Sequence, residues 1–269
     1  MKKLMTACAA CVLAGMVSAQ VESVNIVGYM SQTLTTKNNM IGLNFGAVGT
    51  GAAIPIVDLI PKNQEGLNAG ANVVTGDNIS VLGDSGYVTY FLCNGNIGKG
   101  GAYVAAADGW VKGGESAVTT DAIQVGGAFW FISQTAAPAA PVTLTLAGQV
   151  AADATITKTI KPGLNMIANG YAAEIAFADP ATGLSVGTKG ANVITADNIS
   201  ILAGGGYTTY FFCNGNIGKG GAYVAAADGW VKGGDSAVTT DTVPAGAAAW
   251  YISRGAANFD WVCPRPYSL

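Results

Sequence analysis

One segment of this chain occurs twice, residue for residue. Residues 93–114 and 213–234 both read CNGNIGKGGAYVAAADGWVKGG. The correspondence continues beyond this segment at the same offset, as in the Asp-Asn-Ile-Ser sequence at 77–80 and 197–200. A repeat at fixed spacing restricts the fold strongly, because both copies must form the same kind of unit. It predicts two tandem units of about 120 residues, each large enough to have its own core.

Residues 1–19 have the pattern of a signal peptide. Lys2 and Lys3 are followed by a mostly apolar stretch that ends in small residues before Gln20. This pattern predicts cleavage before Gln20 and an exported protein, extracellular or at the cell surface, with the periplasm as the alternative. No segment of the mature chain is long and apolar enough to predict a membrane-spanning helix.

The repeat also suggests where one unit ends and the next begins. An Ala- and Pro-rich stretch at 136–141 resembles a linker, but the repeat aligns it with residues 256–261, inside the second unit. We therefore expect a first β-domain over residues 20–148 and a second over residues 149–269. A boundary at the end of the Pro-rich stretch is the alternative.

The composition indicates a folded chain with a weakly charged surface. Charged residues make up 11% of the chain and hydrophobic residues 50%, which is the reverse of the balance in disordered proteins. The formal net charge is −3, and an acidic chain suits neither nucleic acid nor an anionic membrane surface as a partner. So few charges give little repulsion between molecules, which favours self-association.

Histidine is absent from the chain, which excludes histidine-based catalysis, metal ligation and pH switching. The Gly-Lys-Gly sequence at 98–100 lacks the Ser or Thr that follows Lys in a phosphate-binding loop. A calcium site at Asp77, Asp84 or Asp108 is an open alternative, as is a carboxylate pair of the glycosidase type. No spacing selects either, and we expect no catalytic residues, no metal and no cofactor.

Short β-branched and aromatic runs alternate with turn signals every eight to twelve residues or so. Residues 78–82 and 87–93 suggest a hairpin around the glycine-containing turn at 83–86. Residues 56–60 suit a short helix or a strand equally well. The pattern predicts an all-β fold, a tandem duplication of a β-sandwich or barrel-like domain.

The segment 129–132 illustrates how the pattern assigns side chains to faces. Alternation with a period of two places Trp130 and Ile132 on one face of a strand, with Phe129 and Phe131 on the other. The second unit keeps the Trp and the Ile but not the two Phe residues. We therefore expect Trp130 and Ile132 to face the core.

Aromatic residues provide the candidate ligand site. Exposed tyrosines and tryptophans can stack against sugar rings while their polar ends hydrogen-bond. Core packing is the alternative for aromatic residues in strands. The predicted sugar-stacking residues are Tyr87, Tyr103, Trp110, Tyr207, Tyr223 and Trp230.

Three cysteines remain in the mature chain, namely Cys93, Cys213 and Cys263. Export permits disulfides, but an odd number cannot pair completely within one chain. Cys213 and Cys263 lie within one predicted unit, so they are the expected disulfide pair. Buried free thiols are the alternative.

The order of motifs resembles a loosely defined group of secreted bacterial β-repeat proteins. These motifs are Val-Gly-Tyr at 27–29, Gly-x-Asn-x-Ile-Ala-Asn at 163–169, Gly-Tyr-x-Thr-Tyr at both 86–90 and 206–210, Gly-x-x-Phe-Trp at 126–130 and Leu-x-Gly-x-Val at 146–150. The resemblance implies secretion and a β fold, and it carries over no site residues. It does not extend to the last strand of the second unit, where Cys-Pro-Arg-Pro stands at 263–266.

Together these features predict an exported structural, adhesive or surface-assembly protein without catalytic activity. The expected partners are further copies of the chain or other surface proteins. The alternative is a carbohydrate-binding protein that holds a polysaccharide on exposed Tyr and Trp side chains.

Overall fold

The computed structural model describes residues 26–137, 140–203 and 206–268. Strands account for 45% of the chain and helices for 8%, which confirms the predicted all-β class. The strands form several antiparallel sheets, an arrangement consistent with a β-sandwich. The predicted signal peptide at residues 1–19 lies outside the described residues. No helix in the described part of the chain is long and apolar enough to cross a membrane.

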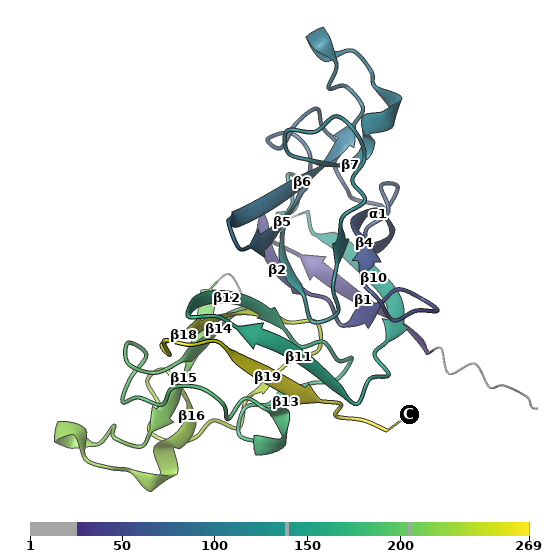
Figure 1. The fold of residues 1–269 in the computed structure, drawn as a ribbon. Coiled ribbons are helices and arrows are strands. Elements are labelled where there is room, and N and C mark those ends of the chain that lie inside the picture. Colours follow the sequence, from purple (N-terminus) through teal and green to yellow (C-terminus); the bar gives the residue numbers. More distant parts are fainter. Residues whose placement is uncertain (1–25, 138–139, 204–205, 269) are drawn as a thin grey trace, which may run out of the picture.

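The first half of the chain forms one main sheet and two smaller ones (Figure 1). Its elements are β1 (Val27–Leu34), β2 (Asn38–Gly42), β3 (Phe45–Gly46), β4 (Ile54–Pro55), α1 (Ile56–Leu59), β5 (Asn78–Gly83), β6 (Gly86–Asn94), η1 (Lys99–Gly101), η2 (Ala105–Ala107), β7 (Asp108–Lys112), β8 (Ala122–Ile123), β9 (Ala128–Ile132) and β10 (Val142–Val150). The main sheet has the order β2-β9-β5-β6-β7, and the smaller sheets are β1-β10-β3 and β4-β8. The predicted hairpin is the β5–β6 pair.

The second half has a main sheet of the same size, with the order β12-β18-β14-β15-β16. Two-stranded sheets β11-β19 and β13-β17 accompany it. Its elements are β11 (Thr155–Ile160), β12 (Gly163–Ala168), β13 (Ile175–Ala176), η3 (Pro180–Thr182), β14 (Asn198–Ala203), β15 (Gly206–Asn214), η4 (Lys219–Gly221), η5 (Ala225–Ala227), β16 (Asp228–Lys232), β17 (Thr242–Val243), β18 (Ala248–Ser253) and β19 (Phe259–Pro264). The second half thus ends in a strand, β19, in spite of the Cys-Pro-Arg-Pro sequence. Pro264 is the last residue of this strand, where the missing backbone N–H disturbs the pairing least.

Each half encloses its own hydrophobic core. In the first half the core lies between the main sheet and the β1-β10-β3 sheet, and Trp110 packs edge-on against Phe131 at a centroid distance of 6.4 Å. In the second half Trp230 stacks on Phe212 at 5.3 Å. β10 ends at Val150 and β11 begins at Thr155, so the halves are joined by residues 151–154, shortly after the predicted boundary.

The structure corrects the predicted face of strand β9. Phe129 and Phe131 are fully buried in the first core, whereas Trp130 and Ile132 lie on the opposite face and are only partly buried. The period-two alternation was right, but the choice of the inner face was wrong. Alternation alone defines two faces, and only the sheet that closes over one of them decides which is inside.

The two identical segments adopt the same conformation. Each leaves its main sheet after β6 or β15, passes through two short 3₁₀ turns and returns as β7 or β16. Gly95 has φ +81°, and a Cβ there would lie 2.3 Å from the ring of Tyr103, so both the conformation and the close ring require glycine. Gly215 and Tyr223 repeat this contact. Figure 1 shows the two segments projecting from opposite ends of the molecule.

The halves meet through the outer faces of their main sheets. The amide of Gly42 on β2 donates to the carbonyl of Gly246 at 2.9 Å. A small apolar cluster joins Met40 and Ala128 of the first half to residues of the second, Met166, Ala168 and Ala248. At the rim of the contact Lys161 forms an ion pair with Asp84. The outer faces are therefore shared between an interface and the solvent.

Candidate functional site

A shallow depression of about 370 Å³ lies on the outer face of the first main sheet. Alternate side chains of four neighbouring strands point outward there, because successive residues of a strand face opposite sides. The depression is lined by Asn38, Ser80, Tyr87, Thr89, Trp130 and Ile132. It combines two aromatic rings, an apolar side chain and three short polar side chains, which is the mixture found in small-molecule sites.

Hydrogen bonds hold this depression in one arrangement. The indole N–H of Trp130 donates to the hydroxyl of Tyr87 at 3.2 Å, which orients the two rings relative to each other. The hydroxyls of Ser80 and Thr89 are 2.8 Å apart and hydrogen-bond across the β5–β6 pair. Tyr87 is 50% exposed, so its ring remains accessible to a ligand.

The second main sheet carries the same Tyr, Trp, Ser and Thr side chains, with Leu164 at the place of Asn38. Trp250 donates to the hydroxyl of Tyr207 at 3.2 Å, and the hydroxyls of Ser200 and Thr209 are again 2.8 Å apart. Tyr207 is exposed to the same extent as its counterpart in the first half. We call the first set, around Tyr87 and Trp130, the first depression, and we name its counterpart, the side chains around Tyr207 and Trp250, the second depression after it; the hollow of about 370 Å³ is that of the first set.

The two depressions adjoin each other at the contact between the halves. The rings of Trp130 and Trp250 lie 6.4 Å apart at an angle of 51°. Strands far apart in the sequence thus bring two similar aromatic surfaces side by side. A single extended ligand could touch both, which a lone depression would not allow.

The structure separates the other predicted stacking tyrosines from these depressions. Tyr103 and Tyr223 are each 59% exposed and stand on the identical segments at opposite ends of the molecule. The hydroxyl of Tyr103 donates to Asp108 at 3.1 Å, and this hydrogen bond raises the pKa of the tyrosine. The hydroxyl of Tyr223 bonds Asp228 in the same way. These tyrosines are accessible but isolated.

The stacking role predicted for Trp110 and Trp230 is wrong. Both are almost fully buried in their cores, and their indole N–H groups donate to the carbonyls of Ile60 at 2.6 Å and Leu184 at 2.7 Å. No ligand can reach these rings without unfolding the core. The sequence analysis missed Trp130 and Trp250 instead. The two phenylalanines flanking Trp130 were the available signal, because Phe is more often fully buried than Trp.

The structure also contradicts the predicted disulfide. Cys93, Cys213 and Cys263 are all free and buried. Cys213 packs in a small cluster on the outer side of β15, and Cys263 belongs to the core beneath β19. Burial raises the pKa of Cys263 to about 11, as expected for an unreactive thiol in apolar surroundings. Cys213 and Cys263 belong to the same half but lie in different layers of it, so their thiols do not face each other.

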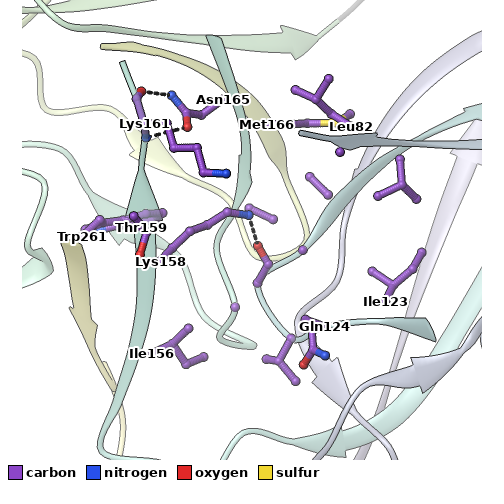
Figure 2. Close-up of a pocket in the computed structure, with 18 of the residues that line it drawn as sticks. Leu82, Ile123, Gln124, Ile156, Lys158, Thr159, Lys161, Asn165, Met166 and Trp261 are labelled. Carbon is purple, nitrogen blue, oxygen red and sulfur yellow. Dashed lines mark hydrogen bonds between the residues drawn. The ribbon is translucent and has the colours of Figure 1, made fainter. Parts of the chain in front are cut away.

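A second concave region, a crevice of about 810 Å³, lies between the halves. Figure 2 shows Lys158 of β11 extending into it towards the carbonyl of Gly126, which accepts its hydrogen bond at 3.0 Å. Its walls include Leu82, Ile123 and Ile156. Burial lowers the pKa of Lys158 to about 8, because the charged amine is largely removed from water.

The carboxylates considered in the sequence analysis have partners within the fold. Asp108 forms an ion pair with Lys62 at 2.8 Å, and these contacts lower its pKa. Asp77 is buried and accepts backbone N–H groups from Asn68 and Gln134 at 2.8 and 2.6 Å. Burial nevertheless raises the pKa of Asp77. Among the described residues no group of three or more His, Cys, Asp or Glu side chains could hold a metal ion.

Comparison with known proteins adds no relative: no family model, no curated protein and no solved structure matches this chain.

Proposed function

We propose that this protein is an exported, non-catalytic adhesive protein that binds polysaccharide in the first and second depressions. The observation that carries the proposal is the Tyr–Trp pair above two hydrogen-bonded hydroxyls, present once on each main sheet. An aromatic ring packs against the C–H face of a sugar, while nearby hydroxyls and amides hydrogen-bond to its hydroxyl groups.

The charges of the surface favour an uncharged glycan. None of the residues that line the first depression carries a charge. A neutral polysaccharide therefore meets no repulsion and leaves no ionic group without a partner. Because Trp130 and Trp250 adjoin, one chain can occupy both depressions, and binding at two linked sites strengthens the overall affinity without new contacts.

The proposal is tested by affinity electrophoresis of the mature protein through gels that contain neutral polysaccharides from a broad panel. Tyr87→Ala and Tyr207→Ala remove one exposed ring from each depression. We expect at least one polysaccharide to retard the wild-type protein, each single variant to bind about tenfold more weakly, and the double variant to migrate freely.

Matched controls come from the isolated tyrosines at the ends of the molecule. Tyr103→Ala and Tyr223→Ala remove rings that are somewhat more exposed and lie outside both depressions, so retardation should persist. The proposal fails if no polysaccharide retards the wild-type protein. It also fails if the control variants lose binding as much as the depression variants do.

Self-assembly is a second candidate because of strand β1. This strand is at the edge of its sheet, and its residues 27–34 carry no charge. Val27 is 58% exposed and Tyr29 79% exposed. An uncharged edge strand of this length can pair with another chain unless it is protected. Sedimentation of wild type and Tyr29→Lys over a wide concentration range tests this, since an edge lysine should abolish multimers. A wild-type monomer at all concentrations would exclude assembly.

A further inference from the structure

The crevice between the halves contains a partly buried lysine, Lys158, for which no acidic partner is found among the described residues. The ammonium group of Lys158 has three N–H donors, and the hydrogen bond that the structure gives it is to the carbonyl of Gly126. Asp84 is the one carboxylate among the described residues that line the crevice, and it pairs with Lys161 at the rim. A buried ammonium without a counterion is unfavourable, so an anion that reaches it would gain a strong partner.

The rest of the crevice is mainly apolar. Figure 2 shows Ile123, Ile156 and Met166 around the space that Lys158 enters. Leu82 adds further apolar surface, while the polar side chains of the lining besides Asp84 and Lys158 are Gln124, Thr157, Thr159, Lys161 and Asn165. A volume of about 810 Å³ is within the range of small-molecule sites. The space therefore suits a ligand with an apolar body and one anionic end.

The fold itself does not require a lysine at this position. Lys158 stands two residues before the end of β11, and Gln32 stands two residues before the end of β1. Each of these strands leads into the first strand of a main sheet, β12 or β2. The first half thus has the neutral amide of Gln32 at the position where the second half has the charged Lys158. The charge of Lys158 is a feature of the crevice and not of the shared architecture.

We propose that the crevice binds a small amphipathic carboxylate, with the carboxylate on Nζ of Lys158 and the apolar body along Ile123, Ile156 and Met166. This site is separate from the two depressions, and the inference does not depend on polysaccharide binding. The ligand would supply the negative charge that the protein leaves out.

Decanoate is the probe for this site, added to the mature protein in a calorimetric titration. Decanol has the same apolar chain without the charge and serves as the comparison ligand. We expect saturable binding of one decanoate per chain, and binding of decanol weaker by about tenfold or more. The absence of saturable decanoate binding up to its solubility limit, or equal binding of decanol, would overturn the proposal.

Two variants locate the site. Lys158→Gln reproduces the residue at the matching position of β1, and it should reduce decanoate affinity by about tenfold or more while leaving decanol binding unchanged. Lys62→Gln removes a surface lysine that is paired with Asp108 outside the crevice, and it should bind decanoate as wild type does. Thermal unfolding checks that both variants are folded. Unchanged decanoate affinity in folded Lys158→Gln would contradict the proposal.

Discussion

The cores of the two halves share the tryptophan of the identical segments, but different side chains pack against it in each half. Trp110 and Trp230 occupy the same place on the main sheets, within segments of identical sequence. Trp110 packs against Phe131 alone among aromatic rings of the described residues, whereas Trp230 contacts Phe177, Phe212 and Tyr251. The identical segment therefore does not dictate how the core is filled, and different side chains can complete the same sheet.

The second core lacks one large side chain of the first core and contains other large side chains instead. Phe129 fills the first core, and its counterpart in β18 is the small residue Ala249. The second core gains Phe177, which stacks on Tyr210 at 4.3 Å, and it also contains Trp261. Cores tolerate such exchanges when the total volume is maintained.

The largest expected effect comes from removing the shared tryptophans. Trp110→Ala and Trp230→Ala each delete a buried ring and its hydrogen bond, and each should destabilise the fold by about 3–5 kcal/mol. The second substitution should cost more, because Trp230 has more aromatic contacts. Denaturant unfolding measures both. Equal costs would show that the extra contacts add nothing, and a negligible cost for either would contradict its placement in the core.

Lys158→Gln makes the second half resemble the first and should stabilise the protein at neutral pH. The pKa of Lys158 is about 8 in the folded protein, below the ordinary value of 10.5, so burying the charged amine costs up to about 3 kcal/mol. Between pH 8 and 10.5 the unfolded chain binds more protons than the folded chain, so this cost disappears as pH rises. The advantage of the variant should therefore be largest at pH 7 and vanish above about pH 10.5.

The pH dependence is measured as the difference in unfolding free energy between wild type and variant, which cancels the titration of other groups. A constant difference between pH 7 and pH 11 would contradict this prediction, because it would mean that folding does not lower the pKa of Lys158.

A smaller effect is expected where one hydroxyl distinguishes the halves. The hydroxyl of Tyr251 donates to the buried Asp197 at 2.9 Å, and Phe131 stands at the corresponding place near Asp77. Tyr251→Phe should cost about 1–2 kcal/mol, because a buried carboxylate loses one donor. Phe131→Tyr is the matched change in the first half. If Tyr251→Phe is neutral by denaturant unfolding, the hydrogen bond contributes no net stability.

The smallest effect is expected in the two identical segments. Tyr103→Phe and Tyr223→Phe each remove an exposed hydrogen bond to an aspartate, at 3.1 and 3.2 Å. Each should leave the thermal unfolding midpoint nearly unchanged, and the two shifts should agree. Thermal unfolding of both variants checks this. Different values would mean that the identical segments have different surroundings.

The sequence supported the β class because strand patterns and turn signals are local. The β5–β6 hairpin illustrates this, since its two strands and its turn were all predicted from residues that are adjacent in the chain. Tyr87 and Tyr207 were also chosen correctly as exposed aromatic residues. Accessibility of a residue in a short hairpin depends mainly on its near neighbours, which the sequence displays.

The sequence did not predict which residues lie beside Tyr87 and Tyr207. Trp130 meets Tyr87 only because β9 inserts beside β5, although long stretches of chain separate them. The same long-range pairing decided that Phe129 and Phe131 face inward. It also placed Cys213 and Cys263 in different layers, so the two thiols predicted to form a disulfide are apart.

The sequence by itself determined that this chain is an all-β protein without histidine chemistry, because composition and short-range periodicity need no knowledge of folding partners. Only the tertiary structure decided which strand faces are inside, that two Tyr–Trp pairs adjoin, and that Lys158 enters a crevice between the halves. The physical reason is that a strand offers two faces and two edges. Which of these is covered depends on segments distant in sequence, whose positions are fixed by burial of the whole core.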